Sequence, residues 1–91
     1  MKTHYIINES TEHIEYKVIE ENDTFTLYYS NAEHWTYPNN EIIQATEYGN
    51  GIKFSTKTPK DMDYSTFEHL HILMMFIRKN LRNDNYLIIT K

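Results

Sequence analysis

The chain of 91 residues contains no cysteine, only two glycines and two prolines, and no long apolar run. The absence of cysteine excludes disulfide bonds, thiolate catalysis and cysteine-based metal sites. Both glycines fall in one tripeptide, Gly49-Asn50-Gly51, so a glycine-rich phosphate loop is excluded as well. No stretch approaches the roughly 18–20 apolar residues of a membrane span, and no signal-peptide pattern is visible. We therefore expect one cytoplasmic domain, residues 1–91, that does not enter a membrane.

Acidic residues outnumber basic ones, 13 to 9, and the two signs are unevenly distributed. Residues 1–50 hold two lysines and nine acidic residues, whereas residues 51–91 hold seven basic and four acidic residues. A basic patch on an acidic chain can still bind an anionic partner, because salt confines the field of each patch to about 8–10 Å. An ordinary mixed, solvated surface is the alternative interpretation of the same distribution.

The pattern of apolar residues predicts an α+β fold. Period-two alternation and flanking turn residues predict strands at 4–8, 13–20, 24–30, 42–48, 52–57 and 86–90. Gly49-Asn50-Gly51 supplies the positive φ angles of a tight hairpin, and residues 31–40, with Trp35, are predicted to be a loop or an irregular edge. Ser65 to Glu68 fits a capping box, and Asn83-Asp84-Asn85 stops the helix that follows. We predict an antiparallel sheet of four to six strands with one long helix near the C-terminus.

The predicted helix is apolar on more than one side. One arc, about 120° wide at 100° per residue, can cover a sheet face; it consists of Phe67, Leu70, Leu73, Met74, Ile77 and Leu81. A second group, Ile72, Met75 and Phe76, lies on a different side. Either a curved sheet wraps the helix, or the second group meets another chain. We favour the second explanation, which predicts a homodimer with an interface of Ile72, Met75 and Phe76.

No residue pattern indicates an enzyme, a metal site or a cofactor. His69 and His71 are two apart on the predicted helix and cannot share an ion, because helical metal pairs need a spacing near four. The chain lacks a nucleophile elbow, and Ser65 is explained by helix capping. The spacing of the glutamates at 12, 15, 20 and 21 does not indicate a pair that acts as general acid and general base. Trp35 is interpreted as core, with an exposed binding position as the alternative.

Six basic residues are candidates for contact with nucleic-acid phosphates. They lie on the outward face of a strand, in a loop and on the helix, and they are Lys53, Lys57, Lys60, Arg78, Lys79 and Arg82. Each neutralised phosphate adds to a steep salt dependence of binding. No residue set indicates which bases are recognised.

Four short motifs occur in a fixed order in the second half of the chain. They are Ala45-Thr46-Glu47-Tyr48, Ile52-Lys53-Phe54-Ser55, Tyr64-Ser65-Thr66-Phe67-Glu68, and Phe76-Ile77-Arg78 with Leu81. Over residues 35–82 the chain thus resembles the later part of ComK, the competence transcription factor family of Gram-positive bacteria. The resemblance implies a regulator that binds A/T-rich DNA, largely from the minor groove, and activates competence genes. Arg78 is the clearest match, and Phe67 and Glu68 are implied to be structural.

Two hypotheses of different class follow. The first is a short ComK-like DNA-binding transcriptional regulator, or a truncated modulator of a full-length relative, acting as a homodimer. The second is an acidic protein-binding inhibitor, from a phage or mobile element, whose glutamate-rich first half binds a basic host protein that handles DNA. A structural subunit of a larger assembly is a third option.

Overall fold

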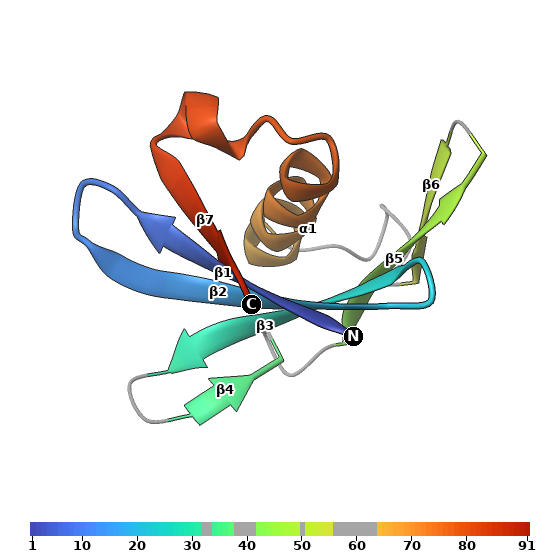
Figure 1. Ribbon diagram of the computed structural model, residues 1–91, viewed down its shortest axis with the longest axis horizontal. Coiled ribbons are helices and arrows are strands. Elements are labelled where there is room, and N and C mark those ends of the chain that lie inside the picture. Colours follow the sequence, from blue (N-terminus) through green and yellow to red (C-terminus); the bar gives the residue numbers. More distant parts are fainter. Residues whose placement is uncertain (32–33, 38–41, 50, 56–63) are drawn as a thin grey trace.

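The computed structural model describes residues 1–31, 34–37, 42–49, 51–55 and 64–91. Seven strands form one antiparallel sheet: β1 (Lys2–Asn8), β2 (His13–Glu21), β3 (Thr24–Asn31), β4 (His34–Thr36), β5 (Ile43–Tyr48), β6 (Gly51–Ser55) and β7 (Tyr86–Thr90). The strand order is β6-β5-β3-β2-β1-β7, and β4 pairs with β3. The helix α1 (Tyr64–Ile77) lies over one face of the sheet, and the short 3-10 helix η3 (Leu81–Asp84) leads from it to β7 (Figure 1).

The α+β class and the antiparallel sheet are confirmed, but the strand number and the helix length are wrong. The structure has seven strands where four to six were predicted. The additional strand is β4, which lies in the segment predicted to be a loop or an irregular edge. Its three residues are too few to show an alternation. The helix has 14 residues, because Lys79 adopts a left-handed φ of 61° well before the predicted stop. No helix in the described residues is long and apolar enough to cross a membrane.

The hydrophobic core lies between the sheet and α1. Alternate residues of the central strands point toward the helix, and Ile6, Val18 and Leu27 are completely buried. The helix side contributes Leu73, and η3 contributes Leu81, both also completely buried. Burial of these apolar side chains is the main contribution to the stability of so small a domain.

The helix buries only part of the side that was predicted to face the sheet: Leu73 of that side is completely buried, but the other buried side chains described in α1 come from the second apolar group. Phe76 is 8% exposed and Ile72 is 9% exposed, and both belong to the core, with Met75 packed against it. Phe67, which was predicted to face the sheet, is 62% exposed. The predicted interface of Ile72, Met75 and Phe76 is therefore wrong for this fold, because these side chains are used within the chain. The first explanation, a sheet that wraps the helix, accounts for its two apolar sides.

A β-bulge changes which face the start of β2 presents. The β1–β2 register shifts between Ile6 and Ile7, so Glu15 is an extra residue in the ladder. The Glu15 carboxylate accepts hydrogen bonds from Asn8 Nδ2 at 3.0 Å and from the Tyr86 hydroxyl at 3.4 Å. Ile14, which was predicted to share the inward face of β2, is instead 44% exposed.

The predicted hairpin between β5 and β6 is confirmed. Tyr48 pairs with Gly51, and Gly49 has a φ of 51°, a conformation that glycine adopts without steric cost. Asn50 lies outside the described residues.

Candidate functional site

The structure does not bring the described members of the predicted DNA-binding set together. Arg78 and Lys79 are exposed side by side directly after α1. Lys53 lies opposite Thr46, which in turn lies opposite Thr24, so the register places Lys53 on the sheet face turned away from α1. Lys57 and Lys60 lie outside the described residues, and only the backbone of Arg82 is described.

The acidic residues of the second hypothesis are also dispersed. Glu15 is held by Asn8 and Tyr86, and the Glu20 carboxylate lies 2.9 Å from His4 Nε2. Glu12 and Glu21 are exposed at opposite ends of β2, about 30 Å apart at the usual rise of a strand. The glutamates at 12, 15, 20 and 21 therefore do not form one acidic surface.

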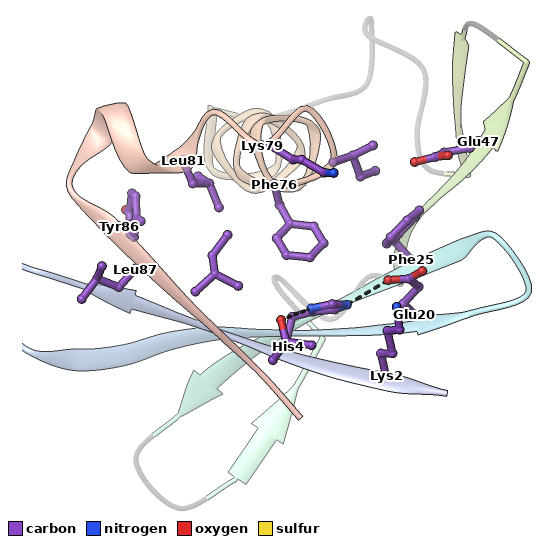
Figure 2. Close-up of a pocket in the computed structure, with 13 residues that line it drawn as sticks. Lys2, His4, Glu20, Phe25, Glu47, Phe76, Lys79, Leu81, Tyr86 and Leu87 are labelled. Carbon is purple, nitrogen blue, oxygen red and sulfur yellow. Dashed lines mark hydrogen bonds and ion pairs between the residues drawn. The ribbon is translucent and has the colours of Figure 1, made fainter.

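A pocket of about 630 Å³ opens between the sheet and the end of α1 (Figure 2). His4, which is 8% exposed, lies on its sheet side, with its ring centroid 4.9 Å from that of Phe76. His4 Nδ1 lies 2.8 Å from Thr90 Oγ1, and Nε2 lies 2.9 Å from Glu20 Oε1. Both ring nitrogens are therefore engaged with side chains from the two neighbouring strands.

The charges around this pocket are mixed. Lys2 and Lys79 line it together with the acidic Glu20 and Glu47 (Figure 2). Two cations and two anions around one opening give no preference for a ligand of either sign. We interpret the Thr90–His4–Glu20 chain as a tie between β7, β1 and β2, because it satisfies a buried imidazole across three adjacent strands.

The helix α1 leaves the opposite face of the sheet uncovered (Figure 1). The strand register places a row of aromatic and cationic side chains on that face. Tyr5, Lys17 and Tyr28 lie directly opposite one another on β1, β2 and β3. Lys17 Nζ lies 4.9 Å from the ring centroid of Tyr28 and 4.9 Å from that of Trp35. An ammonium group within about 6 Å of an aromatic ring is attracted by the negative face of that ring.

Two further aromatic residues complete this surface. The Trp35 ring centroid lies 6.1 Å from that of Tyr5, and the ring of Tyr37 stacks on that of Tyr28 at 5.0 Å. A side-chain hydrogen bond with Tyr37, together with partial burial, raises the pKa of Tyr28 above its usual 10. We call the group Tyr5, Lys17, Tyr28, Trp35 and Tyr37 the aromatic face.

Among the described residues, those with charged side chains around the aromatic face are mainly basic. Lys91 exchanges backbone hydrogen bonds with Thr3, and its Nζ lies 6.0 Å from the Tyr5 centroid. The register adds Lys53 to the same side of the sheet, and it places the acidic Glu21 at one end, opposite Thr24. This side of the sheet thus combines π surfaces with positive charge, although the whole chain has a net charge of −4.

The sequence contained part of the signal for this surface. Alternation places Lys17 and Tyr28 on the outward sides of their strands, but it does not show that they lie directly opposite one another. Trp35 was interpreted as core, yet it is absent from the buried cluster and lies half-buried on the aromatic face. Its position depends on β4, which alternation did not predict.

Comparison of the chain with models of protein families, with curated proteins and with solved structures finds no match. The resemblance to ComK therefore stays a prediction.

Proposed function

We propose that this protein binds single-stranded nucleic acid on the aromatic face, in a regulatory and not a catalytic role. The observation that carries the proposal is the position of Lys17, whose ammonium lies 4.9 Å from two aromatic centroids on the sheet face that α1 does not cover. Aromatic rings that stack on bases, combined with cations that contact the backbone, are the basis of binding to single strands. The ComK resemblance implies the same class of partner, DNA, but through another surface.

The geometry favours a single strand over a duplex. Base pairs in a duplex are stacked on one another, so only their edges are accessible in the grooves. Unpaired bases expose their faces, and these can stack on tyrosine or tryptophan side chains presented by a sheet. Tyr37, which is 36% exposed, and the half-buried Trp35 both offer such a ring on the aromatic face.

The charge on this side of the sheet predicts a moderate dependence on salt. Three lysines, Lys17, Lys53 and Lys91, lie on this side. With about 0.7 counterions released for each neutralised phosphate of a single strand, the slope of log K against log salt is about −2. Stacking therefore supplies much of the binding free energy, and substitutions of aromatic residues are expected to have the larger effects.

Trp35 is the single tryptophan of the chain, so its fluorescence reports directly on the aromatic face. We expect oligothymidylate to change this fluorescence saturably at low salt, and a duplex of equal length to bind more weakly. Tyr28→Ala removes the ring on which Tyr37 stacks and over which the Lys17 ammonium lies. It is therefore expected to weaken binding about 5- to 150-fold, which corresponds to about 1–3 kcal/mol, the contribution of one stacked base. Titration of Trp35 emission in wild type and variant measures both effects.

The matched control is the double variant Arg78→Ala, Lys79→Ala, which removes two exposed cations on the helix side. It is expected to keep the affinity of the wild type for the single strand. Thermal melts followed by circular dichroism establish that each variant is folded. Loss of binding in the control, with binding retained in Tyr28→Ala, would refute the aromatic face as the site.

A further inference from the structure

In the part of the chain that the structure describes, the strand β7 is an exposed apolar edge of the sheet. It ends the strand order, next to β1, and its sequence Tyr-Leu-Ile-Ile-Thr contains no charged residue and no proline. Leu87, Ile88 and Ile89 are 46%, 39% and 47% exposed. Natural proteins usually protect such an edge with lysine, proline or a bulge, because its free backbone groups can pair with another strand. The strand at the opposite end of the order, β6, carries Lys53 in its centre.

The hydrogen bonds of β7 show which of its backbone groups point to the open side. Lys91 and Thr3 exchange both N–H···O bonds, at 2.8 and 2.9 Å, so they form a hydrogen-bonded pair. Such pairs alternate along an antiparallel ladder, and the bond from Glu9 N to Asn85 O continues the same alternation. Leu87 and Ile89 therefore direct their backbone groups to β1. The N–H and C=O groups of Tyr86, Ile88 and Thr90 point away from β1, toward the open edge.

We propose that a second copy of this chain occupies the β7 edge, strand against strand and antiparallel, with Ile88 opposite Ile88 of the other copy. In this register Tyr86 lies opposite Thr90, and Leu87 lies opposite Ile89. Each outward-pointing residue then forms a hydrogen-bonded pair, so every outward N–H and C=O group of the strand gains a partner. The two copies are related by a two-fold axis, the commonest symmetry of homodimers.

The strand is complementary to itself in its side chains, and the pairing brings no like charges together. The exposed apolar residues meet one another: Ile88 packs on Ile88 on the helix side, and Leu87 packs on Ile89 on the other. Directly beyond the strand, Lys91 of one copy lies opposite Asn85 of the other, one residue from Asp84. Lys91 thus meets an uncharged residue, and no like charges lie opposite each other along the pair.

The dimer has a consequence for the aromatic face, although the inference does not depend on the proposed function. Edge-to-edge pairing produces one continuous sheet with both helices on the same side. Both aromatic faces consequently lie on the other side. Three strand spacings across the sheet and two residues along it separate the two Tyr5 positions, about 16 Å in all. A nucleic acid held by one copy can therefore reach the other.

Amide exchange in the intact protein, measured by NMR, tests the register residue by residue. Over roughly a hundredfold rise in protein concentration, we expect the amides of Tyr86, Ile88 and Thr90 to exchange at least about tenfold more slowly, by mass action. The amides of Leu87 and Ile89, already bonded to β1, are expected to change far less. Sedimentation over the same range is expected to show a mass that rises from one chain toward two.

Two variants of one residue separate pairing from folding. Ile88→Pro removes an N–H that points to the open edge, so the ladder with β1 keeps its hydrogen bonds. Ile88→Lys places two ammonium groups opposite each other in the dimer. Each is expected to abolish the concentration dependence. The matched control is Ile42→Lys, which adds the same charge at a residue that is 52% exposed and remote from β7, and it is expected to dimerise.

A wild type that stays monomeric at the highest concentration would overturn the proposal and leave the edge for a strand of a different protein. Dimers that persist equally in both Ile88 variants would overturn it as well. Equal slowing of all five β7 amides would contradict the alternating register. Tyr28→Ala tests the proposed function alone. It is expected to lose nucleic-acid binding and to dimerise as the wild type does, so the two proposals can fail independently.

Discussion

Replacement of Phe76 with alanine is expected to remove a large part of the stability of the fold. Phe76 is 8% exposed, and its ring centroid lies 6.1 Å from that of Phe25 and 4.9 Å from that of His4. A buried Phe→Ala substitution costs about 3–5 kcal/mol, since it removes apolar contacts and leaves a cavity. A natural domain has only about 5–15 kcal/mol to lose. Urea unfolding followed by circular dichroism measures the free energy of unfolding of both proteins.

The matched control lies on the same helix. Phe67 is 62% exposed, and Phe67→Ala is expected to change the free energy of unfolding by no more than about 0.5 kcal/mol. The sequence predicted the reverse, with Phe67 inside and Phe76 at an interface with another chain. If Phe76→Ala stays as stable as the wild type and only lowers the mass in solution, the buried position of Phe76 is contradicted.

The sequence predicted the strands well because alternation is a local property. The strands from 13 to 30 and the hairpin around Gly49 follow from residues that are close in the chain. The buried side of α1 could not be predicted in this way. A helix with apolar residues on two sides has no unique core face, and the sheet that wraps it decides between them. Ile72 and Phe76 were misplaced for this reason.

The candidate site depended on contacts that are distant in the chain. Glu15 turns toward Tyr86, 71 residues away, because a bulge shifts the β1–β2 register. Lys17 meets Tyr28 across one ladder and Trp35 through the short strand β4. Period-two patterns show which residues point outward, but register decides which of them meet. The aromatic face could therefore be seen only once the strands were paired.

Alkaline pH is expected to destabilise the protein through Tyr16. Burial raises the pKa of the Tyr16 phenol far above its usual 10, and the nearby Tyr86 and Glu15 act in the same direction. In the unfolded chain Tyr16 ionises near pH 10, whereas in the folded chain it keeps its proton to higher pH. Below pH 10 both states hold the proton, and this contribution to stability is complete. Above pH 10 the unfolded state binds fewer protons, so the free energy of unfolding falls by about 1.4 kcal/mol per pH unit until the folded pKa is reached.

Tyr16→Phe isolates this contribution, because every other tyrosine is present in both proteins. At neutral pH the variant is expected to be about 1 kcal/mol less stable, since the Tyr16 hydroxyl lies 3.0 Å from His69 Nδ1 and that hydrogen bond is lost. Between pH 10 and 12 the wild type is expected to lose about 2 kcal/mol more than the variant, so the order of stability reverses. Urea midpoints at closely spaced pH values measure the two curves. Parallel curves above pH 10 would show that the phenol of Tyr16 ionises as readily in the folded chain as in the unfolded one, and hence that it is not buried beneath α1.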